Sequence, residues 1–279
     1  MQMTKATIGM AHFSRGELVA ALYVLACVNG LSAKMILSVH RHGWIDAFAG
    51  TFDVSVIVIV ACVVGISLVL ADKGRVSRSD IVVALVLSLM IALPIGAMSW
   101  VAMTMLSLYL LVQRRDAEPQ PQHRGAVILL AVTVPMLWSR LVFDLFANFI
   151  LSVDAALVSK LLGTQRSGNM VQFADHSGTL VIFSSCSSLA NVSLALLCWV
   201  TISEAVGHHK RAEDVFWCLL ACASVVAVNV LRISIMGLSS AKYQMLHSQP
   251  AEILLNIIIV AVVVSICVAG TRSDVFSCA

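Results

Sequence analysis

Long apolar segments separated by short polar ones make up most of the chain. A helix that crosses a bilayer needs about 20 apolar residues to span a hydrocarbon core of roughly 30 Å. The first apolar segment, residues 17–37, also fits a signal peptide. Its apolar run passes the sequence LSA at 31–33 without a clean break, which favours a retained span. Six segments fit the requirement, at residues 17–37, 51–71, 125–147, 186–202, 215–236 and 251–270. The pattern predicts an all-α polytopic membrane protein.

The apolar stretch over residues 80–112 is too long for one span and rather short for two. Pro94 and Gly96 interrupt it. Because proline removes a backbone donor and glycine permits a turn, a tight turn between two helices is one interpretation. A single long helix with a proline kink is the other. The path of residues 147–163 also stays open, with an amphipathic helix on the outer membrane face as a candidate.

The placement of basic residues favours the two-helix interpretation. Cytoplasmic loops are enriched in lysine and arginine, and the loops at 72–80 and 113–124 are both basic. If both loops lie inside the cell, an even number of spans separates them. We therefore expect about eight transmembrane helices, with both termini inside and the start of the sixth helix at the outer face.

Composition agrees with a membrane protein. The 279 residues are 59% hydrophobic and 12% charged, with a mean hydropathy of +0.95, whereas soluble proteins are about 45–50% apolar and about 25% charged. The net charge of +3 gives no reason to expect a nucleic-acid partner. The scarcity of acidic residues in the middle of the spans argues against a proton- or ion-coupled transporter. We expect one integral membrane domain over residues 1–279.

The cysteines divide into two groups. The chain has eight cysteines but no CxxC motif, so neither a zinc site nor a redox motif is indicated and no cofactor is expected. Cysteine inside a span acts as a small apolar filler, which accounts for Cys27, Cys62, Cys198, Cys218, Cys222 and Cys267. Cys186 differs because it lies in SSCSS, where a polar segment becomes apolar.

The residues around Cys186 predict the start of a helix. Upstream, two short β-like runs flank a turn at 175–178, so we expect a small extracytoplasmic hairpin-like segment before the sixth helix. Ser184 and Ser185 are residues that cap helix N-termini, which puts Cys186 in the first turn. The free N–H groups there lower a thiol pKa and favour a nucleophile. A cysteine that only packs at an interface is the alternative.

Two further polar residues are expected at the same membrane face. Arg232 lies in an apolar helix near its outer end, where a charge is a functional hypothesis by default. Asn229 precedes it by three residues and shares its helix face. His247 lies just before the last span. For Arg232 the alternative is an arginine that snorkels to the lipid headgroups, and for His247 it is a solvated loop histidine. His176, in the turn before Cys186, is an alternative to His247 as the base.

The order SSCSS, then NVLRI, then a histidine before the last apolar span resembles the exosortase/archaeosortase family of prokaryotic membrane transpeptidases. The preceding LLGTQRSGNMVQFADHSGTLVIFSSC is similar as well. The resemblance covers roughly residues 161–257 and implies N-terminal spans over 1–160, a catalytic segment over 161–257 and a last span over 251–270. The family usually has glycine two residues after its cysteine, where this chain has Ser188.

The resemblance implies a cysteine transpeptidase or protease of the prokaryotic inner membrane, with its active site on the extracytoplasmic face. Its partners would be membrane-anchored secreted proteins with a C-terminal sorting signal, made of a short motif, a transmembrane helix and a basic tail. Cys186 would attack the scissile carbonyl, Arg232 would stabilise the oxyanion and His247 would transfer protons.

Two other functional classes are alternatives to the transpeptidase. A non-catalytic component of envelope or exopolysaccharide assembly or export would keep the fold without the activity, and Ser188 is its best argument. A rhomboid-like serine protease is less favoured because no GxSG lies in an apolar helix. Arg140 and Asp144, four residues apart, are expected to pair near the outer end of the fifth span in a structural role, with a catalytic role as the alternative.

Overall fold

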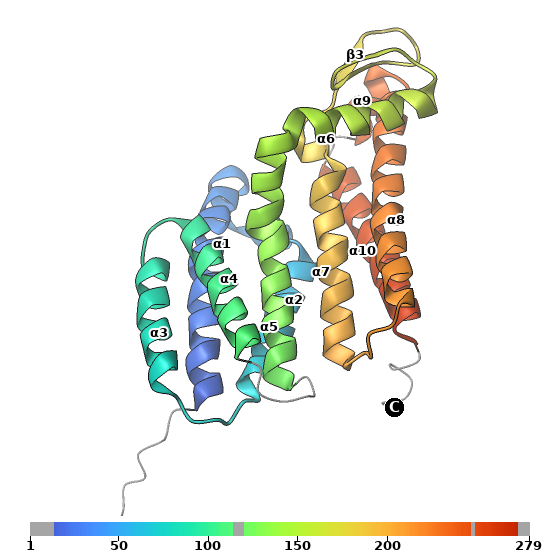
Figure 1. Ribbon diagram of the computed structural model, residues 1–279. Helices are drawn as coiled ribbons and strands as arrows, with labels where there is room; N and C mark the ends of the chain where they lie inside the picture. The colour runs from blue at the N-terminus through green and yellow to red at the C-terminus, as the bar shows by residue number, and fades with distance from the viewer. Residues whose placement is uncertain (1–13, 114–119, 247–248, 273–279) are drawn as a thin grey trace, which may run out of the picture.

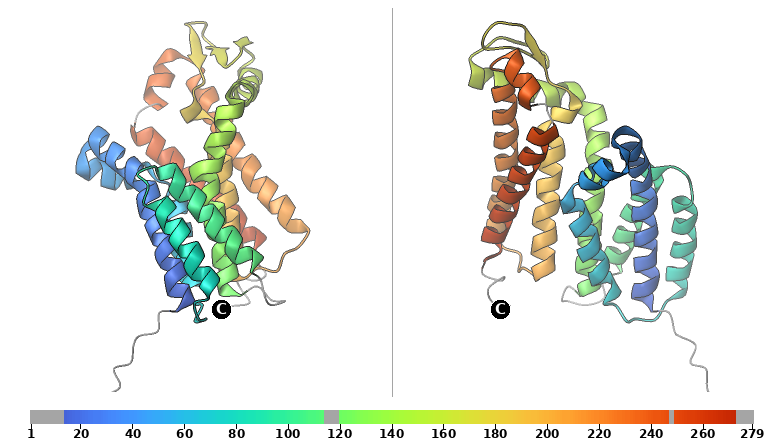
Figure 2. Two further views of the ribbon diagram at one scale, coloured as in Figure 1. Left: turned by 60° about the vertical axis from the view of Figure 1, so that its left-hand side comes forward. Right: turned by 180° about the vertical axis from the view of Figure 1, so that it is seen from behind.

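A computed structural model of the protein describes residues 14–113, 120–246 and 249–272. Most of its helices stand side by side, and short strands cover one end (Figures 1 and 2). The α-helices are α1 Arg15–Ala49, α2 Val56–Leu70, α3 Arg78–Ile91, α4 Gly96–Val112, α5 Pro121–Thr133, α6 Ser139–Leu162, α7 Ser188–Val206, α8 Glu213–Met236, α9 Ser240–Leu246 and α10 Gln249–Gly270. The short elements are the 3-10 turns η1 Thr51–Asp53 and η3 Ser184–Cys186, the π-turn η2 Val134–Trp138, and the strands β1 Arg166–Ser167, β2 Met170–Gln172 and β3 Thr179–Val181.

Several helices are long and apolar enough to cross a membrane. In the described part of the chain there are five, at Arg15–Arg41, Pro121–Leu162, Ser188–Val206, Glu213–Met236 and Ile253–Gly270. The helices α2 and α4 are apolar but shorter. These features support an all-α, multi-pass membrane protein. The expected span over residues 51–71 begins later than predicted, because η1 and the cap Ser55 precede the first turn of α2.

The stretch over residues 80–112 forms two helices, so the interpretation as one kinked helix is wrong. The helix α3 ends at Ile91 and α4 begins at Gly96. A break of this kind exposes backbone carbonyls that need donors. Asn29 of α1 supplies them, with its amide nitrogen 2.8 Å from the carbonyl oxygen of Ile91 and 3.2 Å from that of Leu93.

The helices α5 and α6 follow each other through the π-turn η2, which contains Pro135. Within α6 the backbone leaves helical geometry at Phe146 (φ −121°, ψ 20°). Figure 1 shows the second half of α6 running across the ends of the neighbouring helices. Residues 147–162 are therefore helical, and Ala155 and Val158 on their inner side are fully buried.

The three strands form a small antiparallel sheet in the order β1-β2-β3. The expected β-like runs correspond to β2 and β3, in which Val171 pairs with Leu180. The backbone N–H of Ala174 donates to the carbonyl of Gly237 at 2.9 Å, which ties the sheet to the end of α8. A second, smaller core lies between this sheet, α6 and α8, separate from the main core of the helices; it contains Ala155, Val158, Val171, Phe173, Leu180, Ile182, Val230 and Ile233.

Glycines allow two central helices to approach closely. A Cβ on Gly125 of α5 would lie 2.6 Å from the carbonyl oxygen of Gly65 on α2, and a Cβ on Gly65 would lie 2.7 Å from Leu129. Small residues at such contacts are typical of helix packing in membranes, where van der Waals contact drives association. The α2–α5 contact lies next to fully buried residues such as Leu129 and Val132.

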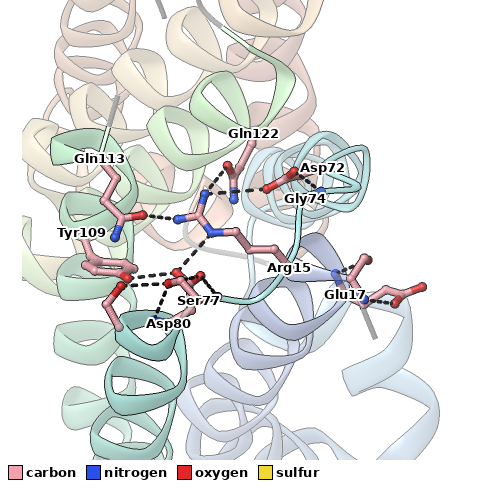
Figure 3. Close-up of polar contacts among 11 residues, drawn as sticks. Arg15, Glu17, Asp72, Gly74, Ser77, Asp80, Tyr109, Gln113 and Gln122 are labelled. Atoms are coloured by element: carbon pink, nitrogen blue, oxygen red, sulfur yellow. Dashed lines mark hydrogen bonds and ion pairs between the residues drawn. The ribbon is translucent and has the colours of Figure 1, made fainter. Parts of the chain in front are cut away.

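Several basic segments lie at the end of the molecule opposite Cys186. Arg15, at the start of α1, contacts Asp80 at the start of α3, Gln113 after α4 and Gln122 near the start of α5 (Figure 3). Arg124 donates from Nε to the carbonyl of Glu204 at 2.6 Å, near the end of α7. Arg15 thus joins the loop at 72–80 to the start of α5, and Arg124 joins the start of α5 to the end of α7. Because α7 begins beside Cys186, both basic segments lie at the opposite end of the molecule. This arrangement agrees with an even number of crossings between them.

Candidate functional site

Cys186 lies in the 3-10 turn η3, one residue before the N-cap of α7. Its backbone N–H donates to the carbonyl of Phe183 at 2.9 Å. The cap of α7 is Ser187, whose Oγ accepts from the N–H of Leu189 at 3.3 Å. The prediction that Ser184 and Ser185 cap the helix and that Cys186 lies in its first turn is therefore wrong. Residues 184–186 form the 3-10 turn, so the next serine, Ser187, caps α7.

A buried polar network joins this turn to two other helices. The carboxylate of Asp154 on α6 accepts from the backbone N–H of Ser188 at 3.1 Å and from its hydroxyl at 2.8 Å. The side-chain amide of Asn229 on α8 donates to the Ser188 hydroxyl at 3.1 Å and to the carbonyl of Cys186 at 2.8 Å. The exposed fractions of Asp154, Ser188 and Asn229 are 2%, 6% and 1%. We call these three residues the Asp154–Ser188–Asn229 network.

The network changes the electrostatics expected at the start of α7. A helix N-terminus favours an anion because its first N–H groups lack partners. Here the N–H of Ser188 already meets the carboxylate of Asp154, and that of Leu189 meets Ser187. A carboxylate of the protein thus occupies the position at which the sequence predicted stabilisation of a thiolate.

Arg232 lies on the same helix as the network residue Asn229, three positions later. Its side chain is half-buried. Residues three apart on a helix lie on one face, so the bond from Asn229 to the Cys186 carbonyl also brings the Arg232 segment of α8 to the turn. Cys186 itself is half-buried and packs against the second core. His247 lies outside the described residues, and its assignment stays a prediction.

The rival base His176 lies at a different place in the sheet. It is exposed in the turn between β2 and β3 and has a left-handed backbone conformation (φ 58°). In the same turn, the side-chain and backbone hydrogen bonds from Ser177 lower the pKa of the exposed Asp175. His176 precedes β3 and Cys186 follows it, so the strand lies between the two residues along the chain.

A pocket of about 320 Å³ lies beside the cysteine turn. It is lined by Ser139, Arg140, Phe143 and Asp144 of α6, by Ser184 and Ser187 next to Cys186, and by Leu189 and Ala190 of α7. Arg140 and Asp144 are both exposed, and the ion pairs found in the described part of the chain do not join them. The expected pairing of Arg140 with Asp144 is therefore wrong. The pocket instead puts a cation and an anion next to the turn.

Sequence reasoning missed the role of Asp154. The only signal was an acidic residue within the predominantly apolar run ILSVDAALV, a place where burial of a carboxylate is costly unless donors meet it. From the sequence, its partner Ser188 is only a departure from the pattern of the family that the chain resembles. The structure brings Cys186, Ser188 and the Asn229–Arg232 segment together.

No family model, curated protein or solved structure matches the chain. Its function must therefore be inferred from its own residues and their geometry.

Proposed function

We propose that the protein is a membrane-embedded cysteine transpeptidase or peptidase that cleaves a C-terminal sorting signal from secreted proteins. The observation that carries this proposal is the hydrogen bond from Asn229 to the carbonyl of Cys186. It sets the helix that bears Arg232 against the turn that bears the thiol. The turn that bears the thiol and the helix that bears the cation, from distant parts of the sequence, are thereby in contact. Ser184 and Ser187 of the same turn also line the pocket.

The chemistry follows from these residue types. The Cys186 thiolate attacks the scissile carbonyl and gives a tetrahedral oxyanion, which the guanidinium of Arg232 stabilises. The carbon–nitrogen bond breaks, the amine leaves with a proton from His247, and a thioester to Cys186 remains. Water or an amine of a lipid or envelope component then attacks the thioester and releases the thiol. In this proposal the site faces the extracytoplasmic side of a prokaryotic inner membrane.

The pocket supports a peptide substrate. Ligand pockets are about 300–1,000 Å³, so a volume of about 320 Å³ accommodates a short segment rather than a folded domain. Its walls combine apolar side chains such as Phe143 with the charges of Arg140 and Asp144. A segment just outside a transmembrane helix has this mixed character.

One observation favours the second candidate, a non-catalytic component of envelope or exopolysaccharide assembly. Asp154 takes the backbone donor at the start of α7 that would otherwise stabilise an anion near Cys186. A protein that only keeps the fold has no need of a thiolate. The two candidates differ in whether any processing depends on the thiol.

The test compares precursor processing in cells that make wild-type protein, Cys186→Ala or the matched control Cys198→Ala. Cys198 is a buried cysteine of α7, 4% exposed. Quantitative proteomics of the envelope follows secreted proteins that end in a transmembrane helix and a basic tail. We expect the tails to be retained with Cys186→Ala and removed with Cys198→Ala. Processing that is unchanged by Cys186→Ala would contradict the proposal and favour the non-catalytic candidate.

A further inference from the structure

We infer that Asp154, Ser188 and Asn229 are positioning residues that hold Cys186 in register with Arg232. The inference deepens the proposed function and rests on it only where substrate processing is concerned. Asp154 and Ser188 have no part in the proposed chemistry itself. Their effect is exerted through the backbone of the cysteine turn.

The burial of Asp154 is the first argument. A carboxylate that is 2% exposed costs several kcal/mol of desolvation unless donors meet it. Both of its oxygens are bonded to the same residue, Ser188, one through the backbone N–H and one through the hydroxyl. Two charge-assisted bonds to one residue restrict its position and its rotamer together. The carboxylate thus fixes Ser188 against α6.

The Ser188 hydroxyl is the second argument, because it joins the two halves of the network. It donates to Asp154 and accepts from the amide of Asn229. The other hydrogen of that amide reaches the carbonyl of Cys186. The turn is therefore held on both sides of Ser187, at the carbonyl of Cys186 and at Ser188.

The network controls the distance between the thiol of Cys186 and the guanidinium of Arg232. Asn229 and Arg232 are three residues apart on one rigid helix, so a shift of Asn229 relative to the turn also shifts Arg232. Without its hydroxyl, residue 188 can no longer connect α6 to Asn229. Glycine at this position lacks that connection. Ser188 is thus an added constraint on the turn in this chain.

The experiment measures two rates on the full-length protein. The first is the alkylation of Cys186 by iodoacetamide in membranes, followed by mass spectrometry of the peptide that contains it. The second is the precursor processing described above. We expect Ser188→Ala and Asp154→Asn to speed alkylation at least five-fold, because a loosened turn exposes a half-buried thiol. We expect both to slow processing at least ten-fold, because the thiol is no longer aligned with Arg232.

Ser193→Ala is the matched control. Ser193 is a serine of α7 that is 3% exposed, and its hydroxyl donates to the carbonyl of Ala190 in its own helix at 2.7 Å. We expect both rates to stay within two-fold of wild type in this variant. If Asp154→Asn does not accumulate, Ser188→Ala and Asn229→Ala carry the test. Rates in Ser188→Ala that match those in Ser193→Ala would overturn the inference.

The two measurements separate this inference from the proposed function. Alkylation needs no substrate, so a five-fold increase in Ser188→Ala supports positioning of the turn even if Cys186→Ala leaves processing intact. In that case only the proposed function fails. If processing requires Cys186 but Ser188→Ala resembles Ser193→Ala in both rates, only the positioning inference fails.

Discussion

The hydroxyl of Ser188 makes contacts that the sequence pattern does not show. From the sequence it is only a departure from the glycine that is usual at this position in the family that the chain resembles. In the structure it is buried and bonded to Asp154 and Asn229, so it restrains the turn from inside. At the residue scale, the carboxylate of Asp154 and the amide of Asn229 fix the backbone around Cys186. Arg232 lies about one helical turn beyond Asn229 on α8.

Arg232 gives the sharpest test at this scale. Removing one donor that stabilises an oxyanion typically lowers kcat by about 10²–10³. We therefore expect Arg232→Gln to reduce the rate of precursor processing by a factor of about 10²–10³. Arg232→Lys keeps the charge but loses the forked donors, and we expect an intermediate rate. Pulse-chase labelling of the precursor measures these rates.

Lys242→Gln is the control for the arginine, because Lys242 is an exposed cation on α9. Its processing rate is expected to equal that of wild type. If Arg232→Gln processes the precursor within three-fold of wild type, Arg232 does not stabilise the oxyanion.

At the scale of elements, Arg15 and Asp80 hold the basic end of the helices together. Asp80 is 4% exposed and accepts from Nε of Arg15 at 3.1 Å and from the hydroxyl of Tyr109 at 2.9 Å. It also accepts from the N–H of Ser77 at 2.8 Å in the capping box of α3. Arg15 reaches from α1 toward Asp80, toward Asp72 in the loop before α3, and toward Gln113 and Gln122 (Figure 3).

We expect Asp80→Asn to lower the free energy of unfolding by about 1.5–3 kcal/mol, the range for hydrogen bonds to charged groups. The substitution keeps the size of the side chain but removes the negative charge that faces Arg15. The free energy of unfolding is measured in mixed detergent micelles. Asp46→Asn, at an exposed position of α1, is the control. Equal stability of the two variants would show that the Arg15–Asp80 contact does not hold these helices together.

Hydropathy predicted most of the long helices because a helix in lipid requires a long apolar run. Pro94 alone left a kinked helix open, and the basic loops on both sides of residues 80–112 favoured their division into two helices. The late start of α2 was missed because the apolar residues before it occupy a turn with left-handed backbone at Phe52. The helix start at Ser188 was misplaced because several serines in a row offer equivalent caps. Asp154 was missed because its partner Ser188 lies 34 residues away in sequence, beyond any local pattern.

At the scale of the whole molecule, the described basic loops lie at one end and the cysteine turn at the other. The positive-inside rule then predicts that the end with Arg15 and Arg124 faces the cytoplasm. The eight-span topology proposed from the sequence gives the same orientation. In that orientation the sheet and the second half of α6, which cover the cysteine end in Figures 1 and 2, lie outside.

Cysteine-accessibility mapping tests this orientation. Ser79 in the basic end and Ser177 at the tip of the sheet are both exposed, so each accepts a cysteine without loss of packing. We expect Ser177→Cys to react with a membrane-impermeant maleimide in intact cells, and Ser79→Cys only after permeabilisation. The opposite pattern would invert the topology and put the proposed site inside the cell.

The central claim is that Cys186 forms a thioester with a substrate polypeptide, and the most direct measurement is the detection of that bond. Full-length wild-type protein, Cys186→Ala and Cys198→Ala are purified from cells under denaturing conditions and treated with neutral hydroxylamine, which cleaves thioesters. We expect hydroxylamine to release polypeptide from the wild type and from Cys198→Ala, with the adduct mapped to Cys186, and none from Cys186→Ala. An adduct that persists in Cys186→Ala, or a wild-type protein that processes precursors without any hydroxylamine-sensitive adduct, would contradict the account.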